Sequence, residues 1–124
     1  MVAQGRSGPL SGIKIIELAG IGPAPFTCMM LADAGAQVLR LERAPAGAVE
    51  AGEAFAQSGS GSYWDLLNRS RPSVGIDLKN PDALELVLDL VEQADGLIEG
   101  FRPGVAERLG VGPDVCFARN KRLV

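Results

Sequence analysis

Short apolar runs alternate along this chain with segments of helical periodicity. Runs rich in Ile, Leu and Val predict buried strands at residues 13–18, 37–42, 73–78 and 96–99, and residues 122–124 look like the opening of another. Strands that alternate with helices require a parallel sheet covered on both faces. The pattern therefore predicts an α/β fold, doubly wound around a mainly parallel sheet.

Helices are predicted between these strands. Residues 26–34 are apolar nearly all round, with Pro25 placed to open a helix and Gly35 to end it. Asn80 and Pro81 supply an N-cap and a first-turn proline for a helix with one apolar face and one acidic face. Shorter helical segments are expected at residues 63–67, 103–109 and 113–119.

The domain organisation follows from length and composition. The chain has 124 residues, 47% of them hydrophobic and 22% charged, which is typical of one globular domain. We expect a flexible lead-in at residues 1–11 and one domain at 12–124. Since the chain stops at the beginning of a predicted strand, we expect this domain to be truncated. Residues 43–61 have little periodicity, which is typical of a functional or mobile connection.

Charge and residue types exclude several classes of function. The net charge of −3 argues against general nucleic-acid binding, and no apolar run is long enough to span a membrane. The chain has no histidine, so it contains no Ser-His triad and no histidine metal site. Cys28 and Cys116 lack a zinc or disulfide spacing and are interpreted as small buried apolar residues. Without a signal peptide, we expect a cytoplasmic protein and no metal site.

Candidate binding residues follow the predicted strands. Ligands of open α/β sheets lie outside the carboxyl ends of the strands. Gly20, Ile21 and Gly22 follow the first strand, Arg43 the second, Lys79 the third, and the segment from Gly100 through Phe101 to Arg102 the fourth. Arginine binds phosphates bidentately and stacks on rings, so this set favours a ligand with phosphates and a nucleobase. Each arginine taken alone is also compatible with a solvated surface charge.

A dinucleotide site is a weaker interpretation of the same segment. Gly20 and Gly22 after one strand and Glu42 at the end of the next imitate part of the dinucleotide-binding fingerprint. The third glycine of that fingerprint is replaced by Pro25, and the basic Arg43 follows the acid directly.

Five ordered motifs carry a resemblance to a known family, and they extend from Gly8 over nearly the whole chain. They are Gly8–Leu18, Gly22–Phe26, Leu31–Val38, Asp77–Lys79 and Phe101–Gly110. Together they resemble the family III CoA-transferases, which include the alpha-methylacyl-CoA racemases. The resemblance implies a Rossmann-like large domain that binds an acyl-CoA thioester, with coenzyme A as part of the substrate and no separate cofactor. It also implies an interlocked homodimer for the full-length protein.

The resemblance also implies roles for particular residues. Arg43 would contact the adenine and phosphate end of CoA, Arg108 would meet a phosphate, and two segments would line the ligand. The segments are Ile76, Asp77, Leu78 and Lys79 beside the nucleotide, and Gly100, Phe101 and Arg102 beneath the pantetheine and diphosphate. No catalytic residue of the family falls within these 124 residues.

Three functions remain open from the sequence. Racemase-like members resemble this chain at Gly100, where members that transfer CoA tend to carry Asn, so we favour an alpha-methylacyl-CoA racemase-like enzyme that exchanges the alpha proton. The alternatives are a family III acyl-CoA:carboxylate CoA-transferase and a non-catalytic CoA-binding or interaction module.

Overall fold

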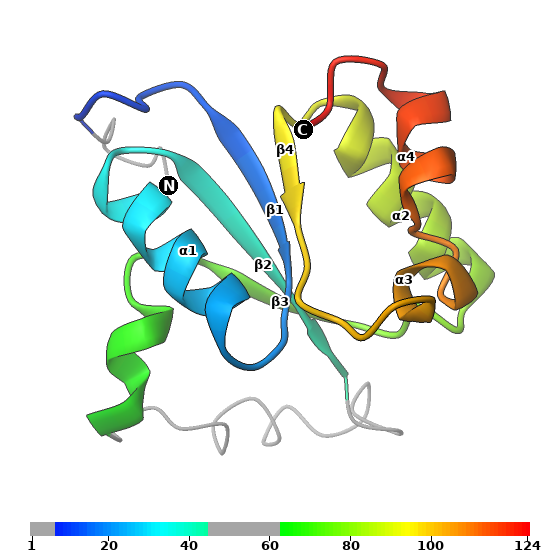
Figure 1. Ribbon diagram of the computed structural model, residues 1–124, viewed down its shortest axis with the longest axis horizontal. Coiled ribbons are helices and arrows are strands. Elements are labelled where there is room, and N and C mark those ends of the chain that lie inside the picture. Colours follow the sequence, from blue (N-terminus) through cyan, green and yellow to red (C-terminus); the bar gives the residue numbers. More distant parts are fainter. Residues whose placement is uncertain (1–6, 45–62) are drawn as a thin grey trace.

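The computed structural model describes residues 7–44 and 63–124 and shows one parallel four-stranded sheet with helices on both faces (Figure 1). The strands lie in the order β3-β2-β1-β4. They are β1 (Lys14–Leu18), β2 (Gln37–Arg43), β3 (Ser73–Ile76) and β4 (Gly96–Ile98). The helices are α1 (Pro23–Asp33), α2 (Pro81–Glu92), α3 (Val105–Arg108), α4 (Pro113–Arg119) and a 3-10 helix, η1 (Tyr63–Asn68).

The helices form a layer on each face of this sheet. Helices α1 and η1 cover one face, and α2, α3 and α4 lie on the other (Figure 1). Every strand pair is parallel, with Leu18 opposite Leu41 and Arg43 opposite Ile76. The predicted α/β class with a mainly parallel sheet is therefore confirmed.

Alternating side chains of the central strands form two cores. Ile16, Leu18 and Leu41 pack with Val87 and Val91 of α2 on one face. On the other face, Ile15 and Val38 pack with Cys28 and Ala32 of α1. The two central strands, β1 and β2, thus contribute to both cores, as expected for a parallel sheet buried on both faces.

Helix α1 begins earlier than the sequence pattern predicts. It starts at Pro23, two residues before Pro25, after Gly22 has turned the chain with a φ of 86°. Both prolines fall in the first turn, where a missing N–H costs nothing. The helix ends at Asp33, and Gly35 has a φ of 102°, which glycine adopts readily.

Helix α2 has the start that its sequence predicts. The Asn80 side chain accepts a hydrogen bond from Asp82 N at 3.0 Å, and Pro81 is the first helical residue. Val87, Leu88 and Val91 are buried on the inner face.

Several other boundaries differ from the predicted ones. Strand β3 ends at Ile76 instead of residue 78, because the chain turns at Asp77. Strand β2 extends by one residue to Arg43, and α3 starts only after Gly104, whose φ of 82° is left-handed. Residues 122–124 form no assigned strand, although Val124 N donates to Asp95 O at 3.1 Å and Val124 O accepts from Leu97 N of β4 at 2.9 Å.

The first described residues pack against the end of α1. Leu10 N donates to Ala34 O at 3.0 Å, and Leu10 is half-buried beside the α1 core. The rest of the predicted lead-in lies outside the described residues, as does most of the irregular connection after β2. Within the described parts of the chain, no helix has the length and apolar character needed to cross a bilayer.

Candidate functional site at the carboxyl ends of the strands

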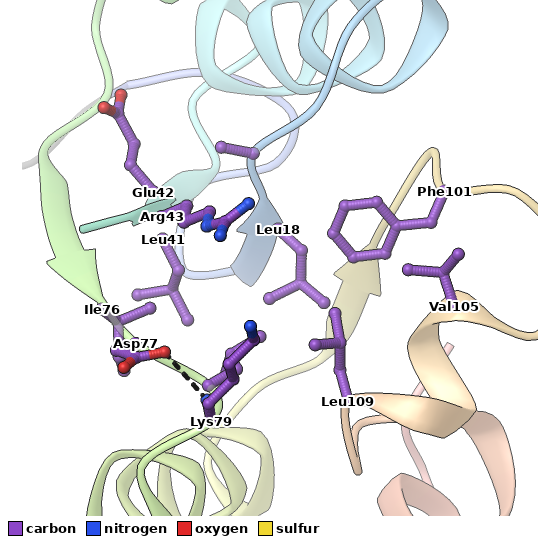
Figure 2. Close-up of a pocket in the computed structure, with 12 residues that line it drawn as sticks. Leu18, Leu41, Glu42, Arg43, Ile76, Asp77, Lys79, Phe101, Val105 and Leu109 are labelled. Atoms are coloured by element: carbon purple, nitrogen blue, oxygen red, sulfur yellow. Dashed lines mark hydrogen bonds between the residues drawn. The ribbon is translucent and has the colours of Figure 1, made fainter. Parts of the chain in front are cut away.

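A cavity of about 340 Å³ opens at the carboxyl ends of β1, β2 and β3 (Figure 2). Its apolar floor comes from the ends of the strands, where Leu18 lies opposite Leu41 and Ile76 opposite Arg43. Figure 2 shows Leu18, Leu41 and Ile76 gathered beneath the opening, with Phe101 at one side. Such a floor suits a flat, apolar part of a ligand.

Cationic and apolar side chains from different elements form the walls. Arg43 ends β2, Lys79 follows β3, and both are exposed at the opening. Val105 and Leu109 of the α3 segment stand beside Phe101 (Figure 2). An apolar floor under two cations fits a ligand that joins a ring to negatively charged groups.

Two of the turns that form this cavity are built in the same way. Asp77 follows the last residue of β3, and its Oδ1 accepts from Lys79 N at 3.0 Å. Glu99 follows the last residue of β4, and its Oε2 accepts from Phe101 N at 2.6 Å. The two turns present Lys79 and Phe101 to the cavity from opposite edges of the sheet.

The cavity brings together six of the nine residues that the resemblance singles out. They are Arg43, Ile76, Asp77, Leu78, Lys79 and Phe101. Gly100, Arg102 and Arg108 lie outside its lining, and both arginines are exposed, Arg102 after β4 and Arg108 in α3. The roles of these nine residues in binding stay predictions.

Gly100 and the loop after β1 lie next to each other. A Cβ atom on Gly100 would stand 3.2 Å from the Ala24 Cβ and 3.8 Å from Ile21 O. The absence of a side chain at Gly100 therefore allows the loop after β4 to approach the start of α1. Gly20, Ile21 and Gly22 lie there, and Ile21 is 92% exposed.

Sequence reasoning missed half of the cavity lining. The missed residues are Leu18, Ala19, Leu41, Glu42, Val105 and Leu109. Most are apolar residues at strand ends or in the α3 segment, whereas the candidates that follow from the strand ends are mainly charged residues and glycines. The alternation of inward and outward positions along each strand was the available signal, since Leu41 and Arg43 share one face.

Glu42 is part of the cavity lining, but its carboxylate is engaged by a neighbouring arginine. Its Oε1 accepts from Arg40 Nε at 2.8 Å, and Figure 2 shows its side chain directed away from Lys79. The start of α1 also lacks two backbone donors, because Pro23 and Pro25 have no N–H. The site therefore differs from a dinucleotide site both at the acid that would bind a ribose and at the helix start that would bind a diphosphate.

A buried ionic network lies behind the site, between β1 and α1. Arg71 Nε lies 2.8 Å from Glu17 Oε2, and Arg40 Nη1 lies 3.3 Å from Glu17 Oε1. Burial raises the pKa of Glu17, against the opposing effects of Arg71 and Arg40, and burial lowers the pKa of Arg71. Within the described residues, no three His, Cys, Asp or Glu side chains gather into a possible metal site.

The sequence matches the profile of CoA-transferase family III over residues 10–124. The chain belongs to CoA-transferase family III. This confirms the family resemblance of the five sequence motifs. Among curated family III relatives, an acyl-CoA transferase from Fusarium pseudograminearum is 36% identical over 98% of the chain. The human alpha-methylacyl-CoA racemase is 37% identical over 93% of it.

A solved structure shares the fold of this chain. The crystal structure of a hypothetical protein from Mycobacterium tuberculosis superposes with a TM-score of 0.76 at 33% identity. The superposition covers 96% of this chain and 32% of that one. The chain likewise spans only 29% of the Fusarium relative and 26% of the human one. It therefore corresponds to about a third or less of these proteins.

Proposed function

We propose that this family III chain is the CoA-binding part of an enzyme that acts on acyl-CoA thioesters. The observation that carries the proposal is the cavity with an apolar floor and cationic rim at the carboxyl ends of the strands. CoA combines an adenine ring with a 3′-phosphate and a diphosphate, and the cavity offers complementary surfaces to both kinds of group.

The size of the cavity indicates which part of CoA it would take. About 340 Å³ lies at the lower end of the range for small-molecule sites, so it admits only part of so long a ligand. In our proposal the nucleotide end enters between Arg43, Lys79 and Phe101. The pantetheine then runs over Gly100 toward the loop at Gly20–Gly22, and Arg102 and Arg108 stay available to the phosphates.

For the reaction we favour alpha-methylacyl-CoA racemase-like chemistry. The thioester carbonyl acidifies the proton on the adjacent carbon, so a paired base and acid can remove that proton and return it to either face. Since the chain has no histidine, we place that pair outside these 124 residues. Acyl-CoA epimerisation would therefore be a property of the whole protein, as would an interlocked homodimer.

A family III CoA-transferase is the second candidate. The relatives include proteins named for either activity. Gly100 favours the racemase, because members that transfer CoA tend to carry Asn at this position whereas racemase-like members resemble this chain there. A transferase would move CoA to a free carboxylic acid instead of exchanging the alpha proton.

The binding proposal is tested by calorimetric titration of the protein with CoA. We expect Arg43→Ala to weaken binding about tenfold or more, because a charge-assisted phosphate contact contributes roughly 1.5–3 kcal/mol. Arg122→Ala is the matched control: it removes the same charge from an exposed position near Val124, which lies beside the amino end of β4. Equal affinity for all three proteins would refute the assignment of Arg43.

The reaction is tested on the whole protein in deuterated water with a chiral 2-methylacyl-CoA. A racemase incorporates alpha-deuterium and loses chirality at the same carbon. A transferase forms a new thioester from an added carboxylic acid without exchange, and a binding module does neither. The 124-residue chain alone should catalyse neither reaction, and measurable exchange by it would contradict the placement of the acid and base elsewhere.

A further inference from the structure

Glu99 lies next to the cavity but contributes no side chain to its lining. Its carboxylate is exposed, and its Oε2 accepts from Phe101 N at 2.6 Å, two residues along the chain. Phe101 does line the cavity. The contact of Glu99 with the site is thus made through the backbone of the loop that carries the aromatic ring.

We propose that Glu99 is a positioning residue, which holds Phe101 over the cavity by accepting its backbone N–H. This inference rests on the proposed function, because the ring matters only if the cavity binds the CoA nucleotide. Neither the family match nor the relatives give Glu99 a role.

The opposite edge of the sheet shows the same device. Asp77 follows β3 as Glu99 follows β4, and it holds the N–H of Lys79, which is also two residues on and also lines the cavity. The two carboxylates therefore hold the backbone amides of the residues whose side chains form the two facing walls. This arrangement at both edges indicates that each carboxylate shapes a wall of the cavity.

The other side of the Glu99 loop is held by packing. A Cβ atom at Gly100 would stand 3.2 Å from the Ala24 Cβ, so the loop rests against the first turn of α1. With α1 on one side and the Glu99 hydrogen bond on the other, the loop has little freedom. Loss of the hydrogen bond would leave the Phe101 backbone without its carboxylate partner and held by the packing of its ring against the core and of Gly100 against α1.

The hydrogen bond to Phe101 N offsets the cost of a carboxylate at this position. A negative charge beside a site for phosphates repels the ligand. Its presence therefore needs a separate stabilising contribution, and the hydrogen bond to Phe101 N supplies one. An uncharged acceptor of the same length would fill this role without the repulsion, whereas a residue that acts through its charge would not tolerate neutralisation.

Two variants separate these possibilities. Glu99→Ala removes the acceptor, and Glu99→Gln keeps an amide oxygen at the same distance but removes the charge. Hydrogen–deuterium exchange of the Phe101 amide, measured without ligand, reports the hydrogen bond directly. We expect exchange to accelerate roughly tenfold in Glu99→Ala and to stay near the wild-type rate in Glu99→Gln.

CoA affinity, measured by calorimetry on the same proteins, is the second readout. Glu99→Ala should bind CoA about tenfold more weakly, and Glu99→Gln should bind at least as tightly as the wild type. Asp114→Ala is the matched control, because it removes an exposed carboxylate of α4 that lies outside the cavity lining. It should leave both exchange at Phe101 and CoA affinity within about twofold of the wild type.

The two readouts distinguish this inference from the proposed function. If the wild type fails to bind CoA, the proposed function falls, and amide exchange still decides whether Glu99 holds the loop. If Glu99→Gln loses affinity as Glu99→Ala does, the charge is what matters and the positioning role is overturned. Unchanged exchange at Phe101 in Glu99→Ala overturns it as well.

Discussion

Cys28 and Glu17 are both fully buried between β1 and α1, where their side chains share a hydrogen bond. Burial raises the pKa of the Cys28 thiol to about 12, and the neighbouring Glu17 carboxylate adds to the effect. Burial also raises the pKa of Cys116, which donates to Val111 O from the other core. Both thiols are therefore protonated and shielded at neutral pH.

We expect neither cysteine to react with a thiol reagent at pH 8 while the protein is folded. In denaturant, both thiols per chain should react, because the unfolded pKa returns to near 9. A colorimetric thiol assay with and without denaturant measures this difference. Fast labelling of the folded protein would contradict the buried, protonated state of Cys28.

Cys28 also gives a pH dependence to the stability. The folded pKa of about 12 lies above the unfolded value near 9, so only the unfolded chain releases this proton between these limits. The stabilisation is therefore complete below pH 9 and declines as the pH rises toward 12. Between pH 9 and pH 12, the Cys28→Ala variant should lose less unfolding free energy than the wild type. Urea denaturation at each pH measures this difference.

At the scale of the elements, Arg71 connects parts of the chain that are distant in sequence. Besides its ion pair with Glu17 of β1, its Nη1 donates to Pro25 O of α1 at 3.2 Å. Its Nη2 donates to Asn68 Oδ1 at the end of η1, at 3.3 Å. Arg71 stands two residues before β3, so this network fixes where the chain re-enters the sheet.

Substitution of Arg71 should therefore destabilise the fold strongly. Arg71→Ala leaves the buried Glu17 without its closest partner, and the loss of one member of a buried pair typically costs about 3–5 kcal/mol. Arg69→Ala is the matched control, because Arg69 pairs with Asp33 on the exposed surface and should contribute less than about 1 kcal/mol. Urea denaturation compares the two, and equal losses would contradict this view of Arg71.

The contrast between α2 and Arg71 shows which features local sequence can predict. Asn80 and Pro81 specify the start of α2 through contacts within the same turn, so the sequence predicted that start. The role of Arg71 depends on Pro25, 46 residues earlier, and on Glu17, and no local pattern carries that information. The early start of α1 was missed because either proline fits a first turn.

At the scale of the whole molecule, the parallel order of the strands made the rim of the cavity predictable. The carboxyl ends of parallel strands share one edge, so Arg43 and Lys79 had to lie near each other. The floor was not predicted, because Leu18 and Leu41 become neighbours only through the register between β1 and β2. Val105 and Leu109 required the docking of α3 on the sheet.

The outer faces of the two long helices differ in character. Helix α2 presents Glu85, Asp89 and Glu92 to solvent, where they pair with Arg119 of α4. Helix α1 presents Phe26 and Met30, which are 51% and 55% exposed and lie one turn apart. An apolar outer face on a surface helix is typical of an interaction surface.

We expect this face of α1 to drive association between copies of the chain. Water-exposed apolar surface is costly, and a second copy of this chain would cover it, in line with the homodimer proposed above. Sedimentation velocity across a concentration series should show self-association that the double substitution Phe26→Ser with Met30→Ser reduces. Leu86→Ser on α2, at a position that is 54% exposed, is the control and should leave association unchanged. A monomer at every concentration, or equal association of the α1 variant, would contradict this assignment.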